Sequence, residues 1–276
     1  AGDYLLQTWL RVCLPSVTVG TVAMNPPITG LFWTQNLMHN LVEECCITFN
    51  DLVAARFDSA HLDFWTAFTV PASKRVGYDN MIGNTTTLNH PHITLPKAVL
   101  NLPLPFFYSR DSGVALPTAA LPYNEMRITF RLRCLAALLG KTDDTTLSCV
   151  EPSDIASNYV AFDPSPSLST VQVWGNYAIV SNDERKRMAC APRDILIEQA
   201  QSVPPVDFLS QQNSQNIDIR FSHAVKVLFF AARNTISCCV RSNYTTMSPT
   251  AAVATFSYRT GSDPLKATSL VYENTA

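Results

Sequence analysis

The residues best suited to chemistry in this sequence are a short Asp-Ser-Gly run and a pair of neighbouring histidines. In the run RDSGVA the acid is Asp111, followed by Ser112 and Gly113. Aspartic proteases place their catalytic acid in such a run, but they need two such aspartates to share one proton. Asp and Ser side chains also hydrogen-bond their own backbone, and glycine accepts positive φ angles. We therefore interpret RDSG as a tight turn and predict that it is not catalytic.

Metal binding and thiol chemistry are the next possibilities. His90 and His92 lie two residues apart in NHPHIT, but no third ligand accompanies them at a suitable spacing. We interpret them as loop residues and predict no metal site. The cysteines include two adjacent pairs and no Cys-x-x-Cys spacing, so we expect free, mostly buried thiols in a reducing compartment. The eight are Cys13, Cys45, Cys46, Cys134, Cys149, Cys190, Cys238 and Cys239.

The composition disfavours several other classes of protein. There is no Gly-rich phosphate loop, Gly-x-Ser-x-Gly or His-Glu-x-x-His motif, so we predict no enzyme activity and no cofactor. The formal net charge of −2 lacks the basic excess of a surface that contacts nucleic acid. The longest apolar run, 224–232, is too short for a transmembrane segment, which needs about 20 residues. Charged residues are only 15% of the chain, against roughly 25% usually, which indicates an uncharged polar surface or extensive burial against other subunits.

The loops that carry these motifs must be held by strands, because alternation with a period of two dominates the sequence. In EMRITFRLR (125–133), apolar residues occupy every second position and polar residues the positions between. Such half-buried strands are typical of antiparallel sheets packed face to face. The same alternation predicts further strands at 6–14, 46–51, 169–180, 195–201, 217–223, 225–233 and 268–274.

Helices are predicted at only three places. Residues 58–68 offer Asp58 or Ser59 as a cap and place Leu62, Trp65 and Phe68 on one face. Residues 71–83 form a second short helix that stops at a glycine, and 181–189 reads as a capped helical turn. Because a new series of strands begins after that charged turn, we place a domain boundary between residues 182 and 193.

The most apolar stretch of the chain is interrupted by prolines. Pro103 and Pro105 are two residues apart, so their missing N–H groups fall on the same side of an extended strand, which suits a sheet edge or a bulge. The run through Pro117 and Pro122 then crosses to the strand at 125–133. We expect the core between the two sheets of the first sandwich to include Phe106, Phe107, Met126, Ile128, Phe130, Leu132, Val171 and Val173.

Several sequence blocks together resemble the major capsid proteins of iridoviruses, part of the double jelly-roll family of large nucleocytoplasmic DNA viruses. The most specific block is LPLPFFYSRDSGVALPTAALPYNEMRI at 102–128. The others, in the family's order, are FNDLVAARFDSAHLDFW, KRVGYDNMIGNT, NDERKRM, DIRFSHAVKVL and ATSLVYENT. They span essentially the whole chain. The family's proteins are longer, so the resemblance implies a fragment lacking the amino-terminal arm and the carboxy-terminal part.

The resemblance implies an all-β fold, a double jelly roll of antiparallel β-sandwiches with a few short helices. Residues 1–185 would form the first jelly roll, missing its amino-terminal strand, and 194–276 the first part of an incomplete second one. An uncovered apolar face is then expected in the second half, at Val225, Val227, Leu228, Phe229 and Phe230.

The function implied by the resemblance is that of a structural subunit of a virus shell. The chain would associate with itself as a homotrimer of pseudo-hexagonal outline, and the trimers would tile an icosahedral capsid. Minor capsid proteins would be further partners, with no direct nucleic-acid contact, and the protein would lie in the virion after assembly in the host cytoplasm. The alternative is a carbohydrate-binding, lectin-like jelly roll, which would need exposed aromatic side chains on a concave face.

Overall fold

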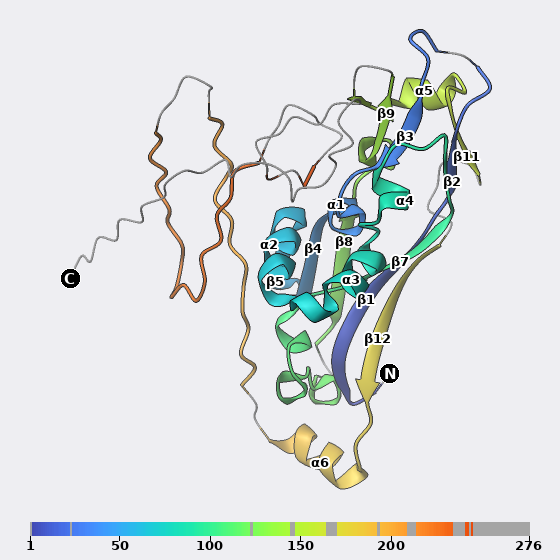
Figure 1. The fold of residues 1–276 in the computed structure, drawn as a ribbon. Coiled ribbons are helices and arrows are strands. Elements are labelled where there is room, and N and C mark those ends of the chain that lie inside the picture. Colours follow the sequence, from blue (N-terminus) through green and yellow to red (C-terminus); the bar gives the residue numbers. More distant parts are fainter. Residues whose placement is uncertain are drawn as a thin grey trace.

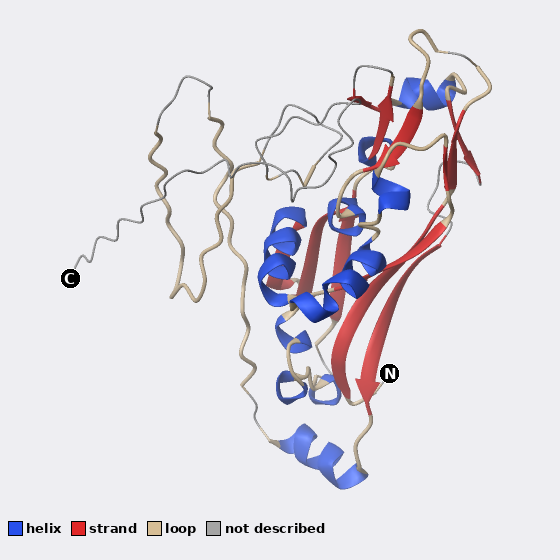
Figure 2. Ribbon diagram, in the orientation of Figure 1, coloured by secondary structure: helices blue, strands red, loops and turns tan. Residues whose placement is uncertain are grey.

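The fold was analysed in a computed structural model of the 276-residue chain (Figure 1). It describes residues 2–22, 24–121, 124–143, 147–163, 170–191, 194–208, 214–233, 241–242 and 244. Within these residues the chain forms short antiparallel sheets, and at least one short helix contacts each of them (Figure 2). The all-β class with a few short helices, predicted from the alternation, is therefore confirmed.

The longest sheet contains three strands in the order β12 (Thr170–Ala178), β1 (Tyr4–Leu14) and β7 (Ala98–Pro103). All pairs are antiparallel, and Leu10 of β1 stands opposite both Val173 and Leu102. The alternation predicted for 6–14 holds along β1, where every second residue from Thr8 to Leu14 is buried. The strand β7 ends at Pro103 on the edge of the sheet, as expected for a residue that cannot donate a ladder hydrogen bond.

The second large sheet has the order β5 (Leu52–Asp58), β4 (Val42–Phe49) and β8 (Met126–Leu132). The central residue Cys45 of β4 pairs with both Phe57 and Phe130. Side chains from this sheet and from the longest sheet meet in one apolar cluster, which is the arrangement of a face-to-face sandwich.

Two smaller sheets extend the structure at the upper end in Figure 1. One has the order β10 (Leu147–Cys149), β9 (Leu139–Thr142) and β3 (Gly30–Trp33). The other has the order β11 (Val160–Asp163), β2 (Ser16–Val19) and β6 (Thr94–Leu95). In the first, Gly140 of β9 pairs with Phe32. A Cβ atom at position 140 would overlap the Phe32 ring, so the close approach of these two strands requires glycine.

The helices are short. They are α1 (Leu37–Leu41), α2 (Ser59–Thr69), α3 (Ala72–Ile82), α4 (Thr86–Asn89), α5 (Pro152–Ala156) and α6 (Asn182–Cys190). Single 3-10 turns occur at Phe107–Ser109, Ser112–Val114, Thr118–Ala120 and Ala136–Leu138. The three predicted helices are confirmed: Asp58 caps α2 by accepting a hydrogen bond from His61 N, Gly83 ends α3 at φ 81°, and Ser181 caps α6.

The predicted core of the sandwich is confirmed in part. Phe106 and Phe107 are buried, and Met126, Ile128, Phe130 and Leu132 of β8 are half-buried against the apolar cluster. The prediction is wrong for Val171 and Val173, whose side chains are 45% and 50% exposed. Both belong to β12, which is an edge strand of its sheet.

The second half of the chain differs from expectation. The described residues of 194–233 contain no strand, so the strands predicted at 195–201, 217–223 and 225–233 are wrong, while 268–274 lies outside the described residues. The expected exposure is found at Val225, Val227 and Phe230, whereas Leu228 and Phe229 are half-buried. The helix α6 separates the sheets from this extended part of the chain (Figure 1).

Candidate functional site

The Asp-Ser-Gly run forms the predicted turn. Asp111 is exposed and accepts a hydrogen bond from Gly113 N at 3.3 Å, which caps the 3-10 turn that follows. The preceding Arg110 lies over the Trp65 ring, 4.5 Å from its centroid, and pairs with Glu198 of the second half. The aspartate thus stabilises its own loop, and the arginine joins the two halves of the chain.

The histidine pair and the cysteines also have local roles. His90 Nδ1 is 3.0 Å from Asn89 Oδ1, and His92 Nε2 is 3.3 Å from the carbonyl oxygen of Thr86. Across the described residues, no group of three or more His, Cys, Asp or Glu side chains is arranged to hold a metal ion. The expectation of free thiols is wrong for Cys149, which is disulfide-bonded. Free thiols are found at Cys13, Cys45, Cys46, Cys134 and Cys190, and Cys238 and Cys239 lie outside the described residues.

The most site-like arrangement in the described residues is a buried polar cluster on the three consecutive helices α1, α2 and α3. His39 of α1 is held between the carboxylate of Asp63 on α2 and the hydroxyl of Tyr78 on α3. The distances are 2.7 Å from His39 Nδ1 to Asp63 Oδ1 and 2.8 Å from His39 Nε2 to Tyr78 Oη. The helices meet here because α2 and α3 are separated only by Val70 and Pro71, and α1 contacts both.

Two residues of the second half complete the cluster. The hydroxyls of Ser242 and Tyr244 each donate to Asp63 Oδ2 at 2.7 Å, while Asn36 Nδ2 donates to Oδ1 at 3.0 Å. Asn40 Nδ2 donates to Ser242 Oγ at 2.8 Å, so the serine proton is the one directed at Asp63. A carboxylate that is only 7% exposed is therefore supplied with four donors, as a buried charge requires.

The electrostatics keep the carboxylate of the cluster charged and its tyrosines neutral. Burial by itself would raise the pKa of Asp63, but hydrogen bonds from His39, Ser242 and Tyr244 outweigh it and hold the pKa below its ordinary value of 3.8. Burial raises the pKa of Tyr78 and of Tyr244, and the charge of Asp63 adds to the effect in both. Because the charged carboxylate can only accept, His39 Nδ1 must be the donor in their hydrogen bond.

The cluster is not arranged for catalysis. A His–Asp pair beside a hydroxyl is a familiar acid–base arrangement, but His39 is fully buried and both of its ring nitrogens are engaged within the protein. No substrate could reach either nitrogen without displacing one of the helices. The cluster joins elements of the fold to each other.

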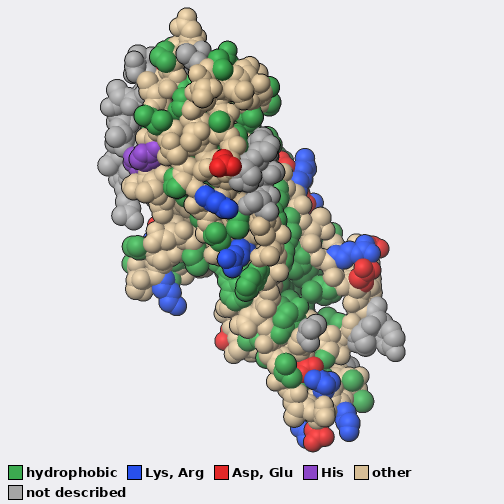
Figure 3. Space-filling model, turned by 90° about the vertical axis from the view of Figure 1, so that its right-hand side faces the viewer, with side chains coloured by type: hydrophobic (Ala, Val, Ile, Leu, Met, Phe, Trp, Pro, Cys, Tyr) green, Lys and Arg blue, Asp and Glu red, His purple; other side chains and the backbone are tan. Residues whose placement is uncertain are grey.

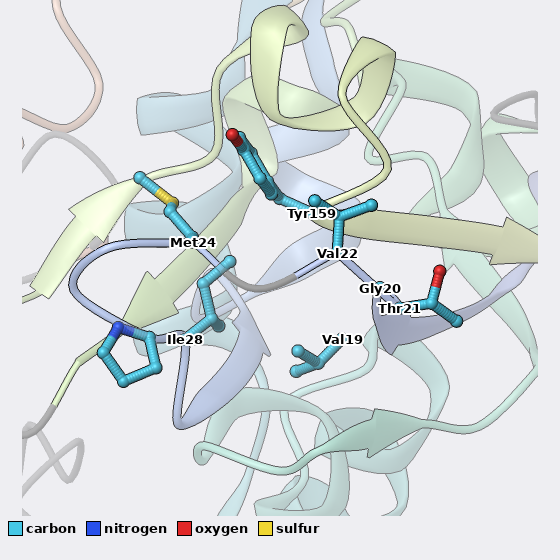
Figure 4. Close-up of a pocket in the computed structure, with 8 residues that line it drawn as sticks. Val19, Gly20, Thr21, Val22, Met24, Ile28 and Tyr159 are labelled. Atoms are coloured by element: carbon cyan, nitrogen blue, oxygen red, sulfur yellow. The ribbon is translucent and has the colours of Figure 1, made fainter.

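A shallow pocket lies elsewhere, between the loop that follows β2 and the residue before β11 (Figure 4). Its volume is about 220 Å³. The lining is mostly apolar and includes no charged side chain; it consists of Val19, Gly20, Thr21, Val22, Met24, Pro27, Ile28 and Tyr159. Such a lining offers surface for packing but no carboxylate, imidazole or thiol for acid–base or metal chemistry.

One edge strand of each large sheet is exposed or only half-buried. The edge strand β12 is exposed along nearly its whole length, and Trp174 on its outer face is 51% exposed beside Arg11 of β1. On the other sheet, β8 is also an edge strand and only half-buried. Figure 3 views this side of the molecule and shows hydrophobic side chains gathered in its middle. Exposed apolar edges of this kind are typical of surfaces that become covered by another chain segment or subunit.

Comparison with known proteins identifies the family to which the chain belongs. The family profile described as "Major capsid protein N-terminus" matches residues 1–180, and "Large eukaryotic DNA virus major capsid protein" matches 184–276. The chain belongs to the viral major capsid protein family. The resemblance seen in the sequence blocks is thereby confirmed.

Several capsid proteins of this family are close relatives over the entire chain. The major capsid protein of Simulium iridescent virus is 57% identical over 290 residues, and that of Tipula iridescent virus is 56% identical over 284. The major capsid protein of Rana tigrina ranavirus is 41% identical over 289 residues. Each alignment covers 100% of this chain but only 60–61% of the relative, so the chain spans about 60% of the length of these proteins.

Solved capsid structures share the fold at low sequence identity. A quasi-atomic model of the PBCV-1 virus capsid aligns with a TM-score of 0.51 and 20% identity, over 72% of this chain and 41% of that one. The Faustovirus major capsid protein aligns with a TM-score of 0.53 and 12% identity, over 67% and 51%. The fold is the double jelly roll of large-virus capsid proteins, and the role of the family is structural rather than enzymatic. Among the described residues, no helix is long and apolar enough to cross a membrane.

The buried cluster was missed by sequence reasoning, which considers His90 and His92 but not His39. One signal was available in the helix at 59–69. Asp63 follows Leu62 directly and lies on the buried side of α2 together with Thr66. Phe68, which was predicted to share a face with Leu62, is instead 74% exposed. An acid on the inward face of a helix indicates a partner, but the partners of Asp63 lie between 24 and 181 positions away and follow only from the folded chain.

Proposed function

We propose that this chain is part of a capsid subunit that associates as a homotrimer of pseudo-hexagonal outline and tiles an icosahedral shell. The observation that carries the proposal is the match of two successive capsid-protein profiles along one chain. Two jelly rolls per subunit give six similar wedges in a trimer, and six wedges fill a hexagonal outline. The low content of charged residues, 15%, supports extensive burial between subunits.

The proposal divides the chain into a first jelly roll at 1–185 and the first part of a second at 194–276. In support, one family profile ends at residue 180 and the next begins at 184. The helix α6 lies at this position and is fixed to the start of the chain, because Arg185 Nε and Nη2 donate to the two carboxylate oxygens of Asp3 at 2.8 and 2.9 Å. This paired hydrogen bond positions the beginning of the connector on the first jelly roll.

The first jelly roll is proposed to receive a further strand that belongs to the longer proteins of the family. The edge strand β12 leaves Val171 and Val173 exposed on the face that points to the core. A strand paired with β12 would satisfy the free backbone edge and cover these two side chains at once. The relatives have the length for it, since this chain spans about 60% of them.

The function is proposed to reside in these surfaces, with no catalytic, cofactor-binding or metal-binding residue. Minor capsid proteins are proposed as additional partners of the assembled shell, and the host cytoplasm as the place of assembly. Membership of the capsid family favours this role over the carbohydrate-binding alternative.

Sedimentation and negative-stain microscopy of the full-length protein test the proposal. We expect a species of three times the subunit mass and particles with a hexagonal outline. A protein that remains monomeric at high concentration would contradict the trimer. A trimer with a triangular outline would contradict the six-wedge arrangement while leaving the family assignment intact.

A further inference from the structure

The carboxylate of Asp63 is divided between the two halves of the chain. Among the residues that the structure describes, its Oδ1 atom receives hydrogen bonds from Asn36 and His39 of the first half. Its Oδ2 atom receives hydrogen bonds from Ser242 and Tyr244 of the second half. The first half therefore presents a buried charge with one oxygen left for donors that come from elsewhere in the chain. We call Asn36, His39, Asn40, Asp63 and Tyr78 the Asp63 socket.

The socket is oriented to receive these two hydroxyls. The side-chain amide of Asn40 also donates to the carbonyl oxygen of Gln35 at 2.7 Å, which fixes the amide that holds the Ser242 oxygen. His39 is held at both ring nitrogens, so it cannot turn away from Asp63. An acceptor and a donor that are already fixed bind a hydroxyl at a lower cost in conformational entropy than mobile ones do.

Contacts around the socket secure the same part of the second half. The Tyr244 ring lies 5.5 Å from that of Phe64, the neighbour of Asp63 on α2. Arg241 donates from its backbone N to Thr34 Oγ1 at 3.1 Å and from Nε to the carbonyl oxygen of Ala137 at 3.2 Å. Earlier in the second half, Phe229 stacks on Phe64 and Phe68 of α2.

We propose that the Asp63 socket is an intrachain docking site that locks the second half of the protein onto the helical side of the first. Ser242 and Tyr244 are the inserted groups, and the charge of Asp63 is the anchor. When these residues leave, Asp63 keeps two of its four donors, and the carboxylate must be rehydrated or neutralised. Occupancy of the socket and the position of the second half are therefore coupled, independently of how subunits assemble.

Tryptic cleavage of the folded chain tests this coupling. The bond after Arg241 is adjacent to the inserted Ser242, whereas the bond after the exposed Lys226 lies outside the socket and serves as an internal reference. In the unmodified chain we expect cleavage after Arg241 to be slow relative to cleavage after Lys226. Tyr244→Phe and Ser242→Ala each remove one donor, and each should raise that ratio at least tenfold. Tyr177→Phe makes the same chemical change on the exposed strand β12 and should leave the ratio unchanged.

A second measurement tests whether the loss of an inserted hydroxyl in the second half loosens α2 in the first half. Hydrogen exchange of the α2 amides should accelerate in Tyr244→Phe, although that residue lies about 180 positions away, and should not accelerate in Tyr177→Phe. Asp63→Asn should raise the cleavage ratio as well, and adding Tyr244→Phe to it should have little further effect. Unchanged α2 exchange in Tyr244→Phe, or a double variant in which the two effects simply multiply, would overturn the proposal. The two hydroxyl deletions keep the test valid even if Asp63→Asn fails to fold.

Discussion

The hydrogen bond between Thr8 and Tyr108 provides the sharpest test of how the apolar, proline-rich stretch is held in the core. Thr8 Oγ1 and Tyr108 Oη are 2.8 Å apart, and both residues are buried. Burial raises the pKa of Tyr108, so its hydroxyl stays protonated. Tyr108→Phe keeps the ring that stacks on Phe106 at 5.4 Å, and it removes only the hydroxyl.

The expected cost follows from what the substitution leaves behind. Tyr108→Phe leaves the buried hydroxyl of Thr8 without its partner, and this should lower the free energy of unfolding of the chain by about 1–3 kcal/mol. For a chain of this size, each kcal/mol corresponds to a shift of about 2–4 °C in the melting temperature. Thr8→Val, which leaves the tyrosine hydroxyl without that partner, should cost a similar amount. The double variant Thr8→Val/Tyr108→Phe should be more stable than the sum of the two single effects predicts, because neither orphaned hydroxyl remains.

The assay is chemical denaturation of the chain and of the three variants. The double-mutant cycle gives the coupling energy of the pair. A coupling energy near zero, with the two single effects additive, would falsify the view that this hydrogen bond stabilises the core. A Tyr108→Phe variant as stable as the unmodified chain would do the same.

Three further predictions concern charge and packing. Folding holds the pKa of Asp63 below 3.8. The charged carboxylate should therefore stabilise the fold fully above that pH, and this stabilisation should be lost as the pH falls through the pKa of the folded state. Between pH 6 and 3, the free energy of unfolding should fall less in Asp63→Asn than in the unmodified chain. Gly140→Ala should lower stability by about 1–3 kcal/mol through overpacking, because its Cβ would overlap the Phe32 ring, and Phe32→Leu should partly restore the melting temperature. Asp3→Asn should accelerate hydrogen exchange along α6, because it removes the charge that Arg185 binds; unchanged exchange would contradict that contact.

The parts of the fold that could be predicted from the sequence are those set by short-range signals. The helix α2 begins where Asp58 can cap it, and α3 ends where Gly83 adopts a positive φ. Likewise Asp111 accepts from its own backbone and forms the expected turn. In each case the donor and the acceptor, or the required backbone angle, lie within a few residues of one another. Local chemistry alone is sufficient there.

The candidate site could not be predicted because its partners are distant. Nothing near His39 in the sequence indicates that its ring is held between Asp63 and Tyr78, and Ser242 reaches the same carboxylate from 179 positions away. The exposure of Val173 has a similar origin. Alternation fixes which face of β12 is apolar, but burial depends on what covers that face.

The second half of the chain shows that an alternating apolar pattern does not by itself specify a strand. Residues 217–223 and 225–233 carry apolar patterns typical of strands, yet these residues form no strand and include bends. A helix satisfies its backbone hydrogen bonds within its own segment, whereas a strand needs a neighbour for every donor and acceptor on its edge. A pattern of period two therefore specifies a strand only together with its partner. That is why the helices α2, α3 and α6 could be predicted from the sequence alone, while the extent of the sheets depends on the segments that pair with their strands.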